Sequence, residues 1–344
     1  MPETGASPPS ERIGPQRRPT LLEVAKHAGV SRATASLVIR DAPGPSAKSR
    51  ERVMRSAAEL GYQPDRNAQL LRSRDSRLLG VMFHAQDPFH ADLIEDIYGA
   101  SEELGYEVVL SAVFPSRSEE RAFAALTTSR CQAVIALGPS VAGGADYAGR
   151  VPIVEIGRPP GETTFDAVYT DDEHGVQLAV DHLVGLGHRD IVHVDGGHAP
   201  GAVERRAGYV VAMNHHGLAA RVLDGDYTER SGAVAGRLLL AEPTLPTAVI
   251  AGNDQCAVGL LDELRHAGID VPGVVSVVGY DDSRLARLVH VDLTTVGQDA
   301  PQLARHAVEA AISRIAQPDG DPAPRVVKLD AHLVIRGSTG QAVR

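Results

Sequence analysis

The N-terminal part of the chain carries the hydrophobic spacing of three short amphipathic helices. Apolar residues recur there every three or four positions, as they do on one face of a helix. Thr20 and Glu23 form a capping box before the first segment, and Gly29 ends that segment. Ser31 and Ser46 stand where the N-caps of the second and third helices are expected. The pattern predicts two short helices joined by a tight glycine turn, followed by a supporting third helix.

From Leu78 onward a different pattern begins. Short runs that are apolar throughout alternate with amphipathic stretches, which is typical of parallel strands covered by helices on both faces. Strands are expected near residues 79–83, 106–112, 133–137, 152–156, 191–195, 248–251 and 275–278. Helices are expected near residues 91–104, 118–129, 174–186, 203–216, 230–240, 254–267 and 299–314. The body is therefore predicted to be α/β, built either as one large sheet or as two doubly wound lobes with a cleft between them.

The N-terminal pattern favours a helix-turn-helix DNA-binding domain. That motif needs a small residue where the helices touch and a glycine where the chain reverses, and Ala25 and Gly29 meet these demands. We place the domain at residues 19–63, after a proline- and serine-rich arm at residues 1–18 that is expected to be disordered. An amphipathic three-helix bundle with no role in DNA binding would show the same spacing, so the helices alone leave both interpretations open.

The distribution of charge favours a DNA-binding role for the N-terminal part. The formal net charge of the 344 residues is −10, but it averages two unlike regions. Residues 1–77 contain 14 Lys and Arg against 8 Asp and Glu, whereas residues 78–344 contain 20 against 36. A basic head on an acidic body suggests that a polyanion meets only the N-terminal end. The alternative is a merely solvated charged face, and the charge counts do not separate the two.

Composition argues against several other classes of protein. No apolar run approaches the ~18 residues of a transmembrane helix, so no membrane partner is expected. The first twenty residues lack the apolar segment of a secretory signal, and a cytoplasmic location is expected. Cys131 and Cys256 are the only cysteines, which supports neither a disulfide framework nor a zinc cluster.

Five histidines invite a metal-site interpretation that their spacing does not support. They are His188, His193, His198, His215 and His216. The first three run at five-residue steps through a predicted strand and a loop, so their side chains should diverge instead of meeting at one ion. No dinucleotide, P-loop or nucleophile-elbow motif is present, although many enzymes have none. We therefore expect no metal, no cofactor and no catalytic residue.

Several segments that follow one another along the chain resemble the motifs of a known family. TLLEVAKHAGVSRATASLVIR and SAKSRERVMRSAAELGYQPDRNAQLLRS are followed by the motifs of the body, in family order and at family spacing. The chain thereby resembles the lactose-repressor (LacI/GalR) family of transcriptional regulators over residues 20 to about 338. The resemblance implies a helix-turn-helix domain, a hinge helix and linker at residues 64–77, and an effector-binding and dimerisation domain at residues 78–338.

The resemblance also implies two lobes of the periplasmic-binding-protein type instead of one large sheet. Three strands would cross between the lobes, near residues 168–170, 296–298 and 324–327. The lobes would then comprise about residues 78–169 and 299–325, and about residues 170–295 and 327–338. Ligands in open α/β sheets bind beyond the carboxyl ends of the strands, so residues at those ends are the ligand candidates.

Seven residues match ligand-contact positions of the family. They are Phe89, His90, Arg158, Arg205, Asn253, Asp254 and Asp281. A carboxylate such as Asp281 facing a guanidinium such as Arg205 suits bidentate hydrogen bonding to hydroxyls or ring nitrogens. For Asp254 and Asp281 the alternative is capping of a following helix; binding is favoured for Asp281 and Arg205 and left open for the strand-end residues. Trp is absent, which leaves Phe89 and Tyr280 among the few stacking candidates.

The DNA contacts are expected mainly from the second helix, lying in the major groove. Arg32 is placed to form bidentate hydrogen bonds to guanine, and Ala33 to touch a thymine methyl group. Ser31 and Thr34 would reach phosphates or bases. Phosphate contacts are expected from Arg40, Lys48, Arg50 and Arg66. Leu37 stands where several family members carry arginine, so the operator sequence of relatives does not transfer.

Residues 64–77 are expected to form a hinge helix that is unstable alone and folds on DNA. Leu71 matches the family's hinge leucine, an apolar wedge inserted at the central base step of the minor groove. Arg72 lies beside it, and Asn67 is a further DNA-contact candidate. Closure of the cleft on a ligand would change the spacing of two N-terminal lobes, and hence the hinge equilibrium and the operator affinity.

The sequence thus predicts a sequence-specific transcriptional regulator, a repressor in the simplest case, that responds to a small sugar or nucleoside-like effector. Two chains, or a higher oligomer, would bind a pseudo-palindromic operator. The sign of the response, induction or corepression, is not written in the sequence. The rival interpretation is a cytoplasmic sugar-binding module or enzyme whose basic head serves another purpose.

Overall fold

The computed structural model describes residues 19–62, 76–138, 151–157, 164–317 and 323–343. The chain divides into two compact units, Met1–Asp75 and Ser76–Arg344. Several predictions lie outside the described residues: the arm at residues 1–18 and the contacts of Arg66, Asn67, Leu71, Arg72 and Arg158. No helix in the described ranges is both long enough and apolar enough to span a membrane.

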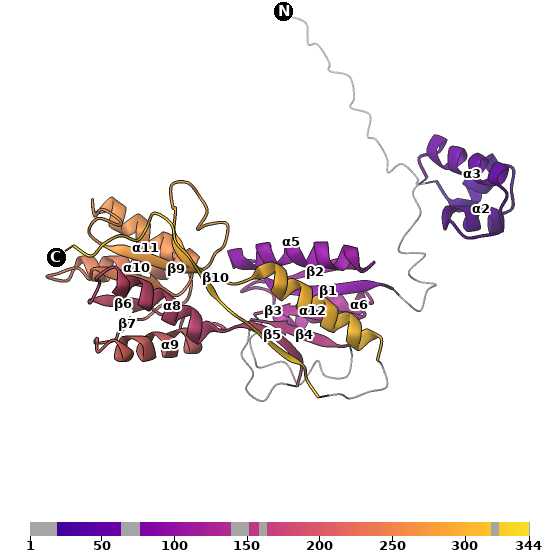
Figure 1. The fold of residues 1–344 in the computed structure, drawn as a ribbon. Helices are drawn as coiled ribbons and strands as arrows, with labels where there is room; N and C mark the ends of the chain where they lie inside the picture. The colour runs from indigo at the N-terminus through magenta and orange to yellow at the C-terminus, as the bar shows by residue number, and fades with distance from the viewer. Residues whose placement is uncertain (1–18, 63–75, 139–150, 158–163, 318–322, 344) are drawn as a thin grey trace, which may run out of the picture. The chain divides into compact units, whose positions relative to one another are not determined.

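The first unit contains the three predicted helices (Figure 1). They are α1 (Leu21–His27), α2 (Arg32–Ile39) and α3 (Ala47–Glu59). The capping box is present, because the Thr20 hydroxyl accepts from the N–H of Glu23 and the Glu23 carboxylate accepts from the N–H of Thr20. Ser31 and Ser46 cap α2 and α3 in the predicted way. Gly29 has a φ of +62° in the turn between α1 and α2, a conformation that glycine adopts without strain.

Small apolar side chains form the core of the first unit. Val24, Ala25, Ala35, Val38 and Val53 are all buried where the three helices meet. Helices as short as α1 and α2 are not stable in isolation, so this packing stabilises them. Full burial of each valine contributes about 1.5–3 kcal/mol. The helices therefore form as a group, and α2 keeps its polar side exposed.

The first lobe of the second unit is a six-stranded parallel sheet with the order β11-β5-β4-β3-β1-β2. The strands are β1 (Leu78–His84), β2 (Glu107–Val113), β3 (Ala133–Leu137), β4 (Ile153–Ile156), β5 (Asp166–Thr170) and β11 (Val326–Leu329). The helices are α5 (Pro88–Glu103), α6 (Glu119–Thr128) and α12 (Ala300–Ile315). α5 and α12 pack together on one face of the sheet, and α6 packs against β1 and β2 (Figure 1). Strands apolar on both faces are thus covered on both, as predicted.

The second lobe repeats this architecture with the order β12-β10-β9-β8-β6-β7. Its strands are β6 (Ile191–Val194), β7 (Arg221–Leu223), β8 (Ala248–Ala251), β9 (Ser276–Asp281), β10 (Thr294–Gly297) and β12 (His332–Val334). Its helices are α8 (Asp172–Gly185), α9 (Ala202–His215), α10 (Glu229–Leu240) and α11 (Asp254–His266). α8 packs on α9 and α10 on α11, over two separate apolar cores. β12 is antiparallel to β10, whereas the other pairs are parallel.

The chain crosses between the two lobes three times. The first crossing follows β5 and the second follows β10, where crossing strands were expected. The third was expected near residues 324–327 but lies at residues 330–331, between β11 and β12. The reason is that Val326–Leu329 pairs in parallel with β5 and so extends the first sheet. The second lobe therefore resumes later than residue 327.

Candidate functional site

A cavity of about 340 Å³ opens where the carboxyl ends of strands from both lobes face each other. This is the place where open α/β sheets bind ligands. Five of the seven residues predicted to bind a ligand line it, namely Phe89, His90, Arg205, Asn253 and Asp281. The structure thus brings together residues that are up to 192 positions apart in the sequence.

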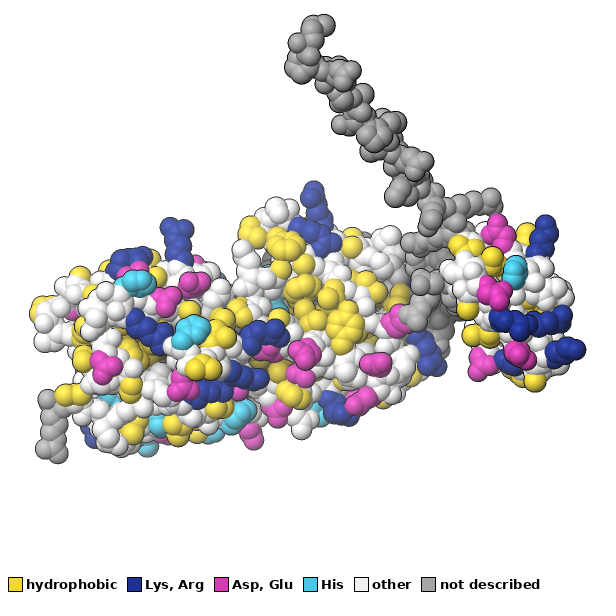
Figure 2. Space-filling model, turned by 90° about the horizontal axis from the view of Figure 1, so that it is seen from above, with side chains coloured by type: hydrophobic (Ala, Val, Ile, Leu, Met, Phe, Trp, Pro, Cys, Tyr) yellow, Lys and Arg dark blue, Asp and Glu magenta, His cyan; other side chains and the backbone are white. Residues whose placement is uncertain are grey.

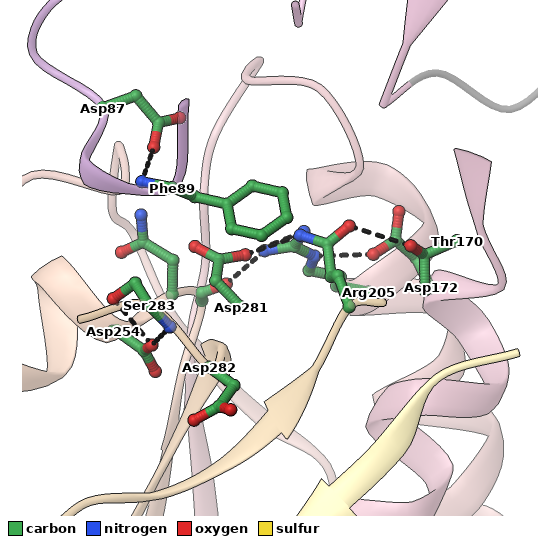
Figure 3. Close-up of polar contacts among 12 residues, drawn as sticks. Asp87, Phe89, Thr170, Asp172, Arg205, Asp254, Asp281, Asp282 and Ser283 are labelled. Carbon is green, nitrogen blue, oxygen red and sulfur yellow. Dashed lines mark hydrogen bonds and ion pairs between the residues drawn. The ribbon is translucent and has the colours of Figure 1, made fainter. Parts of the chain in front are cut away.

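Arg205 is the buried cation of this cavity. Its Nε donates to Asp172 Oδ1 at 2.9 Å and its Nη1 to the carbonyl of Gly252 at 2.7 Å. Its Nη2 lies 3.6 Å from Asp281 Oδ1 (Figure 3). Burial opposes its charge, but the phenol and carboxylate groups around it raise its pKa well above the ordinary value. The guanidinium is therefore a fixed positive charge, oriented by three oxygen atoms.

Tyr280 lies against the guanidinium and not against the cavity. The centre of its ring is 3.7 Å from Cζ of Arg205, a distance typical of a cation–π contact. Its side chain is fully buried and does not belong to the cavity lining. The expectation that Tyr280 stacks on a ligand is therefore corrected: it supports Arg205 from behind.

Asp281 ends β9 in an unusual backbone conformation. Its φ is +110°, a region that L-residues rarely adopt, and such strain costs about 1–3 kcal/mol. Strain of this kind clusters at ligand sites, where the surrounding structure holds it. Burial raises the pKa of Asp281 well above its ordinary value, against the lowering effect of Arg205. The next regular element is β10, so Asp281 does not cap a helix.

Gln298 connects Asp281 to the segments that cross between the lobes. It follows β10 and donates from Nε2 to Asp281 Oδ1 at 2.7 Å. Its amide oxygen accepts from the hydroxyl of Thr170, at the end of β5, at 2.9 Å. The neighbouring Asp171 pairs with Nζ of Lys328 on β11 at 2.6 Å. The three crossing segments are thus bonded to one another beside the carboxylate that faces the cavity.

The adjacent Asn253 and Asp254 have different roles. Asn253 caps α11, accepting from the N–H of Cys256 at 2.8 Å, and also lines the cavity. Asp254 accepts from the N–H and hydroxyl of Ser283 at 2.7 and 2.9 Å (Figure 3). It also accepts from the hydroxyl of Thr295 at 2.6 Å. Burial raises the pKa of Asp254 to about 7. The expectation for Asp254 is therefore corrected: both its oxygens secure the strand ends, and it does not line the cavity.

Phe89 and His90 bring the first lobe to the cavity. They lie in the first turn of α5, whose N-cap Asp87 accepts from the N–H of Phe89 at 2.9 Å. The Phe89 ring points toward Arg205 (Figure 3) and offers an apolar face for C–H groups of a ligand. His90 Nδ1 accepts from the N–H of His84 at 3.2 Å, and burial lowers the pKa of His90. The imidazole is therefore neutral at neutral pH and, with Nδ1 as the acceptor, can donate through Nε2.

An ion pair joins the two lobes beside the cavity. Arg284, in the turn after β9, donates from Nε to Asp92 Oδ1 on α5 at 2.9 Å, and its Nη2 lies 2.8 Å from the same oxygen. The backbone N–H of Arg284 also donates to Asp92 Oδ2 at 3.1 Å, and Glu95 lies 3.7 Å away. These contacts hold the lobes in their present spacing.

The histidines that suggested a metal site point to separate partners. His188 lies 3.0 Å from the carbonyl oxygen of Gly340, and His193 lies 3.1 Å from that of Ile250. His216 pairs with Asp181 at 2.6 Å. Among the residues that the structure describes, no group of three or more His, Cys, Asp or Glu side chains is placed to hold a metal ion.

The predicted DNA-contact residues of α2 lie on its exposed side. Ser31, Arg32 and Ala33 are exposed, and Thr34 is half-buried. The Ser31 hydroxyl lies 2.9 Å from that of Thr34, so both remain near the N-terminus of α2. This is the end of a recognition helix that meets base edges.

The three described residues expected to contact phosphates differ from one another. Arg40 and Lys48 are exposed. Arg50 is half-buried, and its nitrogens bond Asp41 Oδ1 at 2.6 Å and the carbonyl of Ala42 at 2.5 Å. Arg50 thus stabilises the turn between α2 and α3, and its expected contact with phosphate stays a prediction.

Comparison with known proteins agrees with both units. The family described as "Bacterial regulatory proteins, lacI family" matches residues 20–65, and the "Periplasmic binding protein-like domain" matches residues 180–339. The HTH-type transcriptional regulator CelR of Thermobifida fusca is 34% identical, over 94% of this chain and 99% of its own length. The chain belongs to the LacI family. It is a transcriptional regulator that binds DNA through its first unit.

Solved structures of LacI-family proteins share the fold. A LacI transcriptional regulator from a Rhodococcus species is 48% identical and covers 78% of this chain and 100% of its own, with a TM-score of 0.74. The lac repressor dimer bound to operator and the anti-inducer ONPF is 30% identical, covers 94% and 100%, and has a TM-score of 0.78. A CelR–cellobiose complex is 32% identical, covers 93% and 100%, and has a TM-score of 0.68.

Sequence reasoning missed several residues of this LacI-family site. Among those that line the cavity but were not ligand candidates are Asp172, Tyr227 and Gln298. Asp172 follows the first crossing and Gln298 the second, so position at the end of a crossing strand was the available signal. Tyr227 lies in an irregular segment after β7 with a φ of +66°, and no sequence pattern marks it.

Proposed function

We propose that this LacI-family regulator binds a pseudo-palindromic operator as a homodimer and changes its operator affinity when a sugar or nucleoside-like ligand occupies the cavity. The observation that carries the proposal is the convergence of Arg205, Asp281 and Phe89 on one cavity between the two lobes. A guanidinium and a carboxylate side by side suit adjacent hydroxyl groups, and an aromatic face suits the C–H groups of the same ring.

The DNA-reading side of the proposal rests on α2. Arg32 is exposed at its N-terminal end and can reach guanine O6 and N7 with both guanidinium nitrogens. Arg40 and Lys48 are exposed and suit phosphate contacts, which fix the register. A regulator that acts on operator DNA works in the bacterial cytoplasm.

Dimerisation is supported by exposed apolar side chains on both lobes. Figure 2 shows hydrophobic side chains gathered on the surface of the first lobe that carries α5. Exposed apolar residues of that lobe include Tyr98 and Leu104, and Leu288 and Val289 are exposed on the second lobe. A soluble monomer rarely leaves contiguous apolar patches uncovered, so a second chain is the expected partner. The related lac repressor is a dimer on its operator.

A sugar is the first ligand class to test, because the related CelR has been solved with cellobiose. Ligand occupancy would pull Phe89 of the first lobe toward Arg205 and Asp281 of the second. Because Gln298 bonds both Asp281 and Thr170, this movement of the lobes would also shift the crossing segments. In a dimer the spacing of the two hinges would follow, and with it the folding of the hinge around Leu71 on DNA.

The deciding experiment measures retardation of the upstream region of the chain's own gene by the full-length protein. We expect specific binding that weakens steeply with salt, and that is lost from a truncated body of residues 76–344. Leu71→Ala should lower operator affinity while ligand binding persists, and the neighbouring Leu70→Ala is the control. A full-length protein that binds sugar but no DNA would support the rival function, a sugar-binding module or enzyme.

A further inference from the structure

We infer that the ligand of this cavity carries no negative charge: it is an unphosphorylated, non-acidic sugar or nucleoside, and not a sugar phosphate, a uronate or a nucleotide. The inference rests on the proposed ligand-binding role of the cavity and adds the charge class of the ligand. The balance and placement of the charged groups carry it.

Carboxylates dominate the charged groups of the cavity. The lining carboxylates are Asp87, Asp172, Asp226 and Asp281. Within the described part of the lining, Arg205 is the only Lys or Arg. The sequence places Arg158 directly after the lining residue Gly157, and counting Arg158 as a second cation still leaves the carboxylates in excess. Apart from the histidines His84, His90 and His198, the charged side chains of the described lining would therefore repel an anion more than they attract it.

The one described cation is not available to neutralise an anion. Arg205 is already bonded to Asp172 and to the carbonyl of Gly252, and Asp281 lies 3.6 Å away. Any phosphate or carboxylate that reached the guanidinium would lie against Asp172, the buried carboxylate that already bonds it. Like charges at such distances, out of bulk water, repel by several-fold more than they would in water. A hydroxyl group can share the remaining N–H donors without this repulsion.

Two further carboxylates of the lining are partly or fully exposed, one on each lobe. Asp87 belongs to the first lobe and its side chain is 35% exposed, while Asp226 follows β7 in the second lobe and is exposed. Asp226 accepts from the N–H and hydroxyl of Thr228, and these hydrogen bonds lower its pKa. Asp226 is therefore ionised at neutral pH, and it discriminates against anions by repulsion instead of by new contacts.

The remaining polar groups of the lining suit hydroxyls. The Tyr227 hydroxyl is buried and has no hydrogen-bond partner among the described residues, although buried polar groups are nearly always paired. A ligand hydroxyl can donate to it and accept from it. Asn253 and neutral His90 line the same cavity and offer both donors and acceptors. Phe89 and Leu93 supply apolar surface beside them.

The test uses the full-length protein and matched ligands that differ in charge. We would titrate D-glucose, D-glucose 6-phosphate and D-glucuronate, then cellobiose and cellobionate, then adenosine and its 5′-monophosphate, by calorimetry and thermal shift. An uncharged member should bind, and its anionic counterpart should bind roughly tenfold or more weakly. An anionic member that binds as tightly as its neutral counterpart would overturn the inference, and so would a panel in which nothing binds.

Charge variants make the test independent of ligand shape. Asp87→Asn and Asp226→Asn retain an oxygen that can accept the same capping hydrogen bonds. Each should shrink the preference for the neutral member by about threefold, on the order of a weakly screened surface charge. Asp262→Asn, on the exposed side of α11 and outside the cavity lining, is the matched control and should leave the preference unchanged. An equal preference in all three variants would contradict the inference.

The proposed function fails in a different way. If the full-length protein retards no operator, or if a neutral ligand binds without changing operator affinity, the regulatory proposal is wrong. The preference between neutral and anionic ligands would still be measurable, because it depends only on binding in the cavity.

Discussion

The two recognition surfaces of this chain are built in opposite ways. Arg32 of α2 is exposed, and so is Arg40. Arg205 and Asp281 of the cavity are only 5% and 7% exposed. Arg205 donates to Asp172, and Asp281 accepts from Gln298. A residue of the first kind can change without disturbing the fold, whereas a buried ion cluster is part of the core. Substitutions should therefore separate the two surfaces by their effect on stability.

The largest effect is expected at Arg205. Arg205→Ala leaves Asp172 and Asp281 buried without their counter-charge, which should cost about 3–5 kcal/mol of unfolding free energy and abolish ligand binding. Urea denaturation and calorimetry measure both. Arg237→Ala is the matched control, because Arg237 forms a surface pair with Glu263 on neighbouring helices, and it should cost less than about 1 kcal/mol. Equal stability of the two variants would erase the contrast between buried and exposed charge.

Acid should weaken the second unit through His193. Burial lowers the pKa of His193 to about 4, so the folded chain takes up a proton there only below the pH at which the unfolded chain does. Stability is fully present above about pH 6.5 and falls toward pH 4, by about 3 kcal/mol. Denaturation curves at several pH values should show a shallower fall for His193→Gln.

The control for this pH effect is His216→Gln, because His216 lies nearer the surface and pairs with Asp181. If the unfolding free energy fell equally steeply with pH in His193→Gln and in the unaltered protein, groups other than His193 would cause the acid sensitivity.

Arg32→Ala should act on DNA binding alone. Loss of a bidentate contact to guanine costs about 1–3 kcal/mol of operator affinity, while unfolding free energy should change by less than about 0.5 kcal/mol. Fluorescence anisotropy with operator and scrambled duplexes separates base reading from phosphate binding. Arg40→Ala is the comparison, because it should weaken both duplexes alike. If Arg32→Ala also weakens both duplexes equally, Arg32 is a phosphate contact.

The smallest effect is expected from the ion pair between the lobes. Arg284→Gln removes a surface interaction with Asp92 and should change ligand affinity by a few-fold at most. The difference should vanish at high salt. Arg287→Gln is the control in the same loop, since Arg287 bonds Asp282 within one lobe. If both variants changed ligand affinity by the same factor, the contact between Arg284 and Asp92 would not control how the two lobes close.

Local signals predicted much of the fold. The caps at Thr20, Ser31 and Ser46 are confirmed because a capping residue and its partner lie within three positions. Buried strands such as β3 and β8 have the predicted bounds, since a continuous apolar run is visible without knowing its neighbours. Short strands at the sheet edges, such as β7 and β12, were missed because pairing, and not composition, defines them.

Most of the predicted site residues follow a strand, whereas Arg205 lies near the start of α9 and was predicted from its match to a ligand-contact position of the family. Asn253 and Asp254 follow the same strand, yet only Asn253 lines the cavity, because the two side chains leave the backbone in different directions. The pairing of Arg205 with Asp172 depends on how α8 packs on α9, which no local pattern reports. The bonds of Arg50 to Asp41 and Ala42 likewise depend on the turn between two helices, which no local pattern reports.

The sequence by itself determined the order of elements, the two kinds of unit and the chemical types at the site, because helix caps, apolar runs and charge segregation are properties of neighbours along the chain. Tertiary structure alone decided which of those residues meet. Five predicted ligand residues share one cavity, Gln298 joins them to the crossing segments, and the carboxylates around Arg205 set the charge of the cavity. Such facts depend on distances between segments up to two hundred residues apart, and a periodicity a few residues long holds no information about them.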